Sequence, residues 1–150
     1  VYVPIGMGSG ISGMIAARDA LGLTTKIVGV VAENAPAYAL SFAKGEAVST
    51  NTANTLADGV ACRTPDAAAV SIRNKGADRI VSVSEDEITH AMGCYFTDTH
   101  NLAEGAGAVP LAALLKEKDQ IAESCVGLVL SGGNVDRSLF SQVLKTPLGA

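Results

Sequence analysis

The chain has 150 residues, which is enough for one domain with a substantial hydrophobic core. Hydrophobic residues make up 48% of it and charged residues 17%, and the net charge is −4. This acidic balance argues against a phosphate backbone or an anionic lipid surface as partner, and no apolar run reaches transmembrane length. We therefore expect no nucleic-acid or membrane partner and a cytoplasmic location.

The first thirteen residues predict a strand that runs into a glycine-rich turn. VYVPI is apolar and rich in β-branched residues, and glycines follow at positions 6, 8, 10 and 13, where a helical pattern over 11–21 begins. Glycines allow the backbone to approach a ligand closely, and a helix N-terminus adds partial positive charge. The stretch therefore predicts a phosphate-binding turn, although a plain strand-to-helix connection has a similar pattern.

The remaining elements alternate between strands and helices. Further strands are predicted at 26–31, 79–83 and 125–130, and further helices at about 36–45, 64–76, 84–100, 109–118 and 136–144. Such alternation predicts an α/β fold with a doubly wound parallel sheet, in which ligands bind at the carboxyl ends of the strands. Three segments fall at that edge: the glycine turn, the long polar loop 48–59 and the turn 131–134.

Several polar residues have a structural interpretation. Ser84 followed by three acids is typical of a capping box, so these carboxylates are expected to stabilise a helix start. The cysteines and histidines show neither disulfide-framework nor metal-ligand spacing, and we expect no metal site. The residues concerned are Glu85, Asp86, Glu87, Cys62, Cys94, Cys125, His90 and His100.

One hypothesis for the glycines is a dinucleotide-binding domain. Residues 8–13, GSGISG, satisfy the GxGxxG pattern after a strand, and Glu33 follows the next strand. This match leaves two other small-residue segments, EGAGA at 104–108 and SGGN at 131–134, without a role.

The second hypothesis accounts for all of these segments. The chain carries VPIGMGSGISG from Val3, TLADG at 55–59, EGAGA at 104–108 and SGGNVD at 131–136. In this order and spacing the segments resemble the fold-type II pyridoxal 5'-phosphate (PLP) enzymes, and among them the threonine/serine dehydratases. The resemblance covers almost the whole chain and implies a partial tryptophan synthase beta-like fold.

The resemblance also implies roles for individual residues. The glycine turn would hold the phosphate of PLP, with Met7 and Ser9 standing where the family usually has glycine, and Gly59 would lie against the ring. Glu104 would form the inner wall of the site or, alternatively, cap the next helix. Ser131 would face the pyridine nitrogen and so favour β-elimination over transamination. The implied cofactor-binding residues are Gly6, Met7, Gly8, Ser9, Gly10, Gly59, Glu104, Ser131 and Gly132.

The implied activity is removal of the β-hydroxyl and amino groups of L-threonine or L-serine, giving a 2-keto acid and ammonia, in a homodimer. The Schiff-base lysine of the family lies in a Ser-Phe-Lys-x-Arg segment, which this chain lacks, and Val31 and Ala37 replace acids that bind a cation in some members. We therefore expect residues 1–150 to be the C-terminal portion of the large PLP-binding domain, without the lysine-bearing half or the small domain, and inactive alone. None of its lysines is expected to bind PLP covalently: Lys26, Lys44, Lys75, Lys116, Lys118 and Lys145.

Alternatives remain at this point. The stretch 33–42, ENAPAYALSF, also fits a hydroxyectoine-utilisation dehydratase of the same family. The chain could instead be an NAD-binding Rossmann domain or a non-catalytic module that binds anions.

Overall fold

A three-stranded parallel sheet lies at the centre of the computed structural model, which describes residues 1–121 and 124–146, with Arg73 described by its backbone only. Its strands are β1 (Tyr2–Pro4), β2 (Val28–Ala32) and β3 (Arg79–Val83), in the order β1-β2-β3. Tyr2 pairs with Val28, and Val28 with Arg79, so all three strands begin at one edge. The α/β class and the parallel sheet predicted from the sequence are confirmed.

The strand predicted at 125–130 is reduced to a single bridge. Leu128 pairs in parallel with Tyr2, on the edge of β1 opposite β2. The Tyr2 N–H donates to the Gly127 carbonyl (2.9 Å), and the Val129 N–H donates to the Tyr2 carbonyl (3.1 Å). The prediction of a full strand was wrong, because β1 has only three residues and gives this segment little to pair with.

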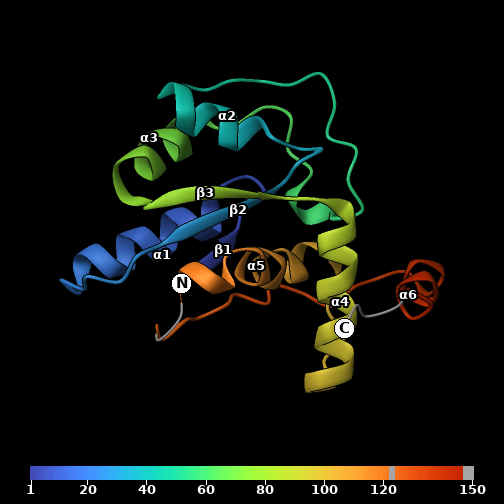
Figure 1. Ribbon diagram of the computed structural model, residues 1–150. Helices are drawn as coiled ribbons and strands as arrows, with labels where there is room; N and C mark the ends of the chain where they lie inside the picture. The colour runs from blue at the N-terminus through green and yellow to red at the C-terminus, as the bar shows by residue number, and fades with distance from the viewer. Residues whose placement is uncertain (122–123, 147–150) are drawn as a thin grey trace.

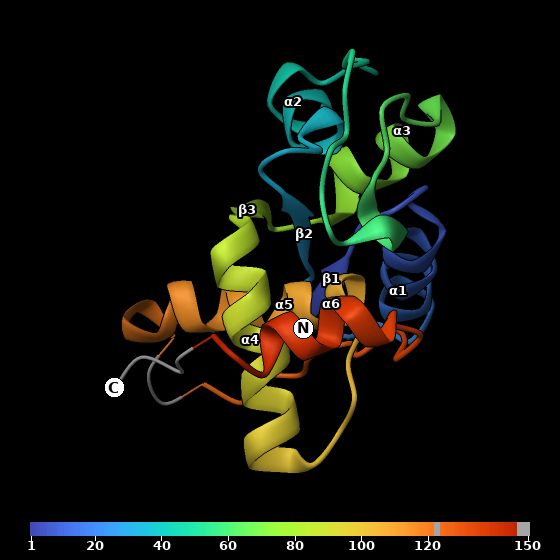
Figure 2. The ribbon, with the colours of Figure 1, turned by 90° about the vertical axis from the view of Figure 1, so that its right-hand side faces the viewer.

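Six helices and two short 3₁₀ turns surround the sheet in the described part of the chain. Helices α1, α2 and α3 cover one face of the sheet, and α4 and α5 cover the other, as the view along the strands in Figure 2 shows (compare Figure 1). The helices are α1 (Ser9–Ala20), α2 (Ala37–Lys44), α3 (Ala67–Gly76), α4 (Glu85–Thr99), α5 (Gly105–Lys116) and α6 (Arg137–Val143), and the turns are η1 (Asp58–Val60) and η2 (Lys118–Gln120).

The two faces of the sheet bury separate cores. Side chains alternate along each strand, so Val30 faces the core formed with α4 and α5, whereas Val31 faces the core that holds Ile11 of α1 and Tyr38 of α2. All five residues of β2 are buried. This explains why β2 reads as a continuous apolar run in the sequence.

Of two helix starts predicted from the sequence, one is confirmed and the other is wrong. The capping box at α4 is confirmed: the Ser84 hydroxyl accepts from the Glu87 N–H, and the Glu87 carboxylate accepts from the Ser84 N–H. Helix α5, in contrast, begins at Gly105 and not at the predicted residue 109. The prediction treated the glycines of EGAGA as helix breakers, but they form the first turn of the helix.

Hydrogen bonds join three side chains at the amino end of the sheet. The Glu117 carboxylate accepts from the Tyr2 hydroxyl (2.6 Å) and from Arg79 Nη2 (2.6 Å) and Nε (3.0 Å). Burial and the neighbouring Glu117 raise the pKa of Tyr2 to about 12. The hydrogen bonds from Arg79, opposed by burial, keep the pKa of Glu117 below its ordinary value.

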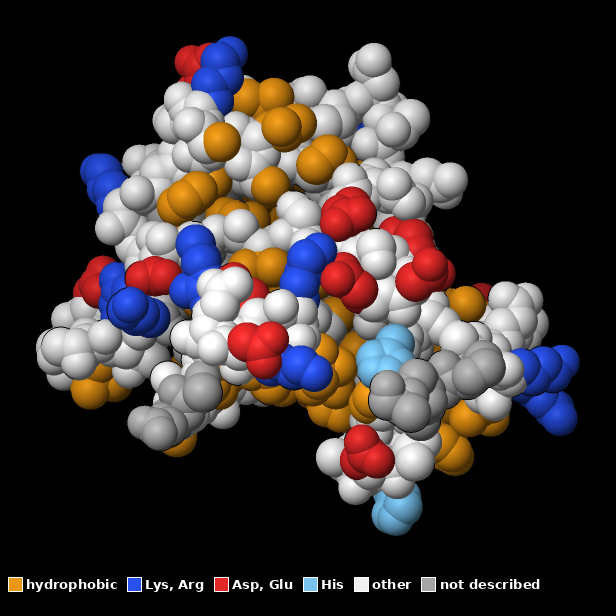
Figure 3. Space-filling model, viewed as in Figure 1, with side chains coloured by type: hydrophobic (Ala, Val, Ile, Leu, Met, Phe, Trp, Pro, Cys, Tyr) orange, Lys and Arg blue, Asp and Glu red, His pale blue; other side chains and the backbone are white. Residues whose placement is uncertain are grey.

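The surface shows several exposed hydrophobic side chains. Leu40 of α2 is 45% exposed and Met7 of the glycine turn is 64% exposed. Figure 3 shows hydrophobic side chains at the surface over α2. Among the described residues, no helix has both the length and the apolar character that a membrane span requires.

Candidate cofactor site

A cavity of about 330 Å³ lies at the carboxyl end of β1. Its wall comes from four segments that are far apart in the sequence: the glycine turn, the 3₁₀ turn η1, the start of α5 and the chain after the Leu128 bridge. The residues lining it are Val3, Pro4, Gly6, Met7, Gly8, Ser9, Gly10, Gly59, Val60, Glu104, Ala106, Val129 and Ser131. The carboxyl end of a parallel sheet is where the alternating pattern predicts a ligand.

The glycine turn leads from β1 directly into α1. Gly8 is the N-cap of α1 and has a φ of 92°, a backbone conformation that favours glycine. The first intrahelical bond runs from the Ser12 N–H to the Gly8 carbonyl (3.1 Å), and no side chain caps the helix. The preceding N–H groups of the first turn are therefore left for a ligand at the positive end of the helix dipole.

The segment 55–59 brings Gly59 directly against the glycine turn. A Cβ on Gly6 would lie 2.3 Å from the Gly59 carbonyl oxygen, so the two backbones touch without a side chain between them. The Leu56 N–H donates to the Glu85 carboxylate (2.8 Å). Glu85 therefore holds this segment in place, a role that the capping interpretation of the three acids did not predict; the reciprocal cap belongs to Ser84 and Glu87.

Glu104 occupies the inner wall of the cavity. Its Oε2 accepts from the Asn134 N–H (3.0 Å), and its own N–H donates to the Gly132 carbonyl (3.1 Å). It stands at the N-cap of α5, but its side chain makes no capping hydrogen bond. The carboxylate is thus directed toward the 131–134 turn and the cavity, and the alternative of a capping acid is not what the structure shows.

Close contacts between backbones join α5 to the neighbouring segments. A Cβ on Gly107 would lie 2.5 Å from the Gly132 carbonyl oxygen, and one on Gly105 would lie 2.8 Å from Cα of Ala57. The small residues of EGAGA therefore let α5 contact both the 131–134 turn and the 55–59 segment. This packing places Glu104 between them.

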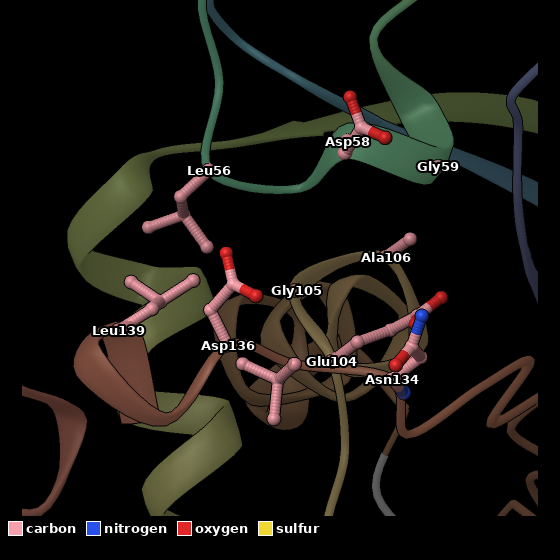
Figure 4. A pocket seen from close by; sticks show the side chains of 10 residues that line it. Leu56, Asp58, Gly59, Glu104, Gly105, Ala106, Asn134, Asp136 and Leu139 are labelled. Carbon is pink, nitrogen blue, oxygen red and sulfur yellow. Dashed lines mark hydrogen bonds between the residues drawn. The ribbon is translucent and has the colours of Figure 1, made fainter. Parts of the chain in front are cut away.

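A second pocket of about 400 Å³ adjoins the cavity and shares Gly59, Glu104 and Ala106 with it. Figure 4 shows Leu56 and Leu139 at one end of this pocket and the Glu104 and Asn134 side chains together at the other. The two compartments give room for a flat ring with groups attached on more than one side.

The structure brings together all but one of the predicted site residues. Gly132 does not line the cavity; it lies behind Glu104, where a Cβ would be 2.7 Å from Oε1. The other predicted residues all line it: Gly6, Met7, Gly8, Ser9, Gly10, Gly59, Glu104 and Ser131.

Sequence reasoning missed two residues that hold the walls in place, Glu85 and Tyr38. The Tyr38 hydroxyl donates to the Met7 carbonyl, and the side chain is buried in α2. A tyrosine on the buried face of a helix needs a partner for its hydroxyl, and this signal could have pointed toward it.

No lysine lines the cavity, and in the part of the chain that the structure describes no group of three or more His, Cys, Asp or Glu side chains could hold a metal ion. The cavity instead offers backbone N–H groups, the hydroxyls of Ser9 and Ser131, and one carboxylate. This donor set fits a phosphorylated aromatic ring better than a metal ion.

Comparisons with known proteins agree with this geometry. The family described as pyridoxal-phosphate dependent enzyme matches residues 1–132. The chain is 35% identical over 148 residues to an L-threonine ammonia-lyase of Thermotoga maritima and 39% identical over 145 residues to a catabolic L-threonine dehydratase of Escherichia coli K12. These matches cover 99% and 95% of this chain, but only 37% and 44% of the relatives.

A solved structure shows the same arrangement. The processed form of threonine deaminase isoform 2 from Solanum lycopersicum aligns with a TM-score of 0.88 at 29% identity, covering 96% of this chain and 43% of that one. The tryptophan synthase beta-like fold inferred from the sequence is thereby confirmed for the part that the chain spans.

Proposed function

The chain belongs to the family of pyridoxal-phosphate dependent enzymes, and from this premise we propose that its protein is a dehydratase that converts L-threonine or L-serine into a 2-keto acid and ammonia. The observation that carries the proposal is the convergence of four separate segments on one cavity: residues 6–10, residue 59, residues 104 and 106, and residue 131. The relatives named as threonine ammonia-lyase and dehydratase supply the substrate class.

The residues of the cavity suit PLP. The bare N–H groups at the start of α1 would bind the phosphate, and the hydroxyl of Ser131 would bind the ring nitrogen. When bound, PLP supplies an electron sink for negative charge at the carbon that carries the amino group. Because a hydroxyl does not hold the ring nitrogen protonated as a carboxylate does, Ser131 keeps that sink weak and favours loss of a β-substituent.

Other residues of the chain shape the surroundings of the ring. Val3, Val60 and Val129 give the cavity an apolar part that excludes water. Glu104 is held by the Asn134 N–H, so its carboxylate stays in one place at the inner wall. It is positioned to accept a hydrogen bond from a donor in the cavity.

The length of the relatives bears on the domain organisation. The chain spans 37% to 44% of the curated relatives that it matches. We propose that residues 1–150 correspond to part of the large cofactor-binding domain, and that a lysine elsewhere in the protein binds PLP covalently. We likewise propose that the protein is a homodimer and is located in the cytoplasm.

The dinucleotide hypothesis has no support in the structure. The third glycine of a GxGxxG turn serves close packing of helix on strand, whereas a Cβ on Gly13 would meet no atom within 4 Å. The family match also concerns PLP and not NAD.

The direct test is an assay of the complete protein, purified and supplied with PLP, on L-threonine and on L-serine. We expect equal amounts of ammonia and 2-keto acid, and a lower kcat in Ser131→Ala than in the unchanged protein. Asn51→Ala, on the exposed part of the 48–59 loop, serves as control and should retain full activity. Binding of NAD together with no binding of PLP would contradict the proposal.

A further inference from the structure

The Tyr38 hydroxyl joins three segments behind the glycine turn. The side chain is 1% exposed, its hydroxyl donates to the Met7 carbonyl, and it accepts from the Asp66 N–H (3.2 Å). Asp66 in turn accepts from the Ala69 N–H (2.8 Å) at the start of α3. One hydroxyl therefore ties the glycine turn to both α2 and α3.

The position of Tyr38 determines which way the Met7–Gly8 peptide faces. In a planar trans peptide the C=O and the N–H point in opposite directions. Because the Met7 carbonyl points to Tyr38, the N–H of Gly8 points away from Tyr38. Met7 and Gly8 line the cavity and Tyr38 does not, so this N–H is directed from the buried side of the turn toward the cavity.

The surroundings of Gly8 agree with this orientation. A Cβ on Gly8 would lie 3.0 Å from the Tyr38 hydroxyl and 2.9 Å from Cβ of Ala69. Tyr38 and α3 therefore fill the space behind the turn, and the open side is the cavity.

A glycine-rich turn needs such a restraint. Glycines at 6, 8 and 10 give this backbone many accessible conformations, and fixing one of them costs conformational entropy when a ligand binds. The Met7 side chain is 64% exposed and anchors the turn poorly. A hydrogen bond that holds the turn before binding removes part of this cost.

We propose that Tyr38 is a positioning residue for the phosphate site: its hydroxyl orients the Met7–Gly8 peptide so that the Gly8 N–H faces the bound phosphate. The inference rests on the proposed function, because it requires that the cavity bind PLP. It adds a residue outside the cavity wall that sets the affinity for the phosphate group in particular.

Tyr38→Phe tests this role, because it removes the hydroxyl and keeps the ring. In the complete protein, dissociation constants are measured for PLP and for pyridoxal, which has the same ring without the phosphate. We expect Tyr38→Phe to weaken PLP binding roughly fivefold, as the loss of one hydrogen bond predicts, and to leave pyridoxal binding unchanged. The control is Tyr95→Phe, a buried tyrosine of α4 in the other core, which should change neither constant.

The outcomes separate this inference from the proposed function. Equal weakening of PLP and pyridoxal, or no weakening of either, overturns the positioning role alone. Failure of the unchanged protein to bind PLP overturns the proposed function and this inference together.

A measurement on the unchanged protein covers the case in which Tyr38→Phe does not fold. The backbone amide resonance of Gly8 is followed by NMR during titration with PLP and, separately, with pyridoxal. A shift that PLP causes and pyridoxal does not supports the role of the Gly8 N–H, whereas no difference between the two ligands overturns it.

Discussion

At the amino end of the sheet, hydrogen bonds join the side chains of Tyr2, Arg79 and Glu117. Arg79 and Glu117 form a bidentate ion pair. At the carboxyl end, the contacts run between backbones: Gly6 against Gly59 and Gly107 against Gly132. The first arrangement fills one end of the sheet with charged side chains. The second keeps side chains out of the backbone contacts and leaves a cavity lined by backbone groups, small side chains and the Glu104 carboxylate.

Because of this difference, substitutions at the two ends of the sheet should have different effects on stability and on ligand binding. Substitutions at the amino end should change the free energy of unfolding and leave ligand affinity alone, because the network lies at the edge where the strands begin, away from the cavity. Substitutions at the carboxyl end should change both, because the same backbone contacts that hold the segments together also shape the cavity.

The largest effect is expected from Gly107→Ala. The new Cβ would lie 2.5 Å from the Gly132 carbonyl oxygen and 3.3 Å from its nitrogen, so two backbone segments must separate. We expect a loss of about 2–3 kcal/mol in the free energy of unfolding, measured by urea titration, and weaker binding of PLP.

Gly13→Ala is the matched control for Gly107→Ala. Gly13 is an exposed helical residue of α1 with open space around its Cβ position. Alanine there should raise the free energy of unfolding by about 0.5–1 kcal/mol through its better helix propensity. Similar effects of the two substitutions would contradict the role of backbone packing at the carboxyl end.

A smaller effect is expected from Glu117→Gln at the amino end. The substitution keeps the shape and removes the charge that Arg79 contacts, which should cost about 1–2 kcal/mol in the free energy of unfolding at neutral pH. Because the folded protein lowers the pKa of Glu117 from 4.5, this contribution is present above pH 4.5 and is lost as the pH falls through the folded value. Urea titrations at neutral and acidic pH measure both expectations.

Glu46→Gln is the control for the amino-end pair. Glu46 contacts Lys44 at 2.7 Å, but both side chains are exposed, so no change in stability is expected. We expect Glu117→Gln to leave PLP binding unchanged. If it weakens PLP binding as strongly as Gly107→Ala does, the expectation that substitutions at the amino end affect only stability is wrong.

A further effect appears only at alkaline pH. Below pH 10 the phenol of Tyr2 stays protonated in the folded and the unfolded protein. Between pH 10 and about 12 the unfolded chain loses this proton first, so the free energy of unfolding falls with rising pH. In Tyr2→Phe this part of the decline should be absent, and identical pH profiles of the two proteins would contradict it.

The sequence predicted much of the fold because its signals were local. The run 26–31 gave a buried strand, found at 28–32, and the strand at 79–83 and the Ser84 capping box were found where predicted. Errors arose where the outcome depended on distant partners. The segment 125–130 has strand composition, but β1 offers it a single bridge, and EGAGA reads as a break although tertiary packing makes it a helix start.

The candidate site divides in the same way. Small-residue motifs show in the sequence because a close approach of backbones demands glycine at particular positions. The roles of Glu85 and Tyr38 could not be predicted from the sequence, because each acts on a segment about 30 residues away. Glu85 accepts a hydrogen bond from the Leu56 N–H, and Tyr38 donates one to the Met7 carbonyl.

By itself, then, the sequence determined the order of strands and helices, the glycine turn before α1 and the set of motifs that resemble a PLP site. These follow from the conformational preferences of neighbouring residues and from glycine's lack of a side chain. Only the tertiary structure decided that Gly6, Gly59, Glu104 and Ser131 share one cavity and that Tyr38 orients the Met7–Gly8 peptide. Contacts of this kind depend on how the helices pack across the sheet, and that geometry is set by the whole core.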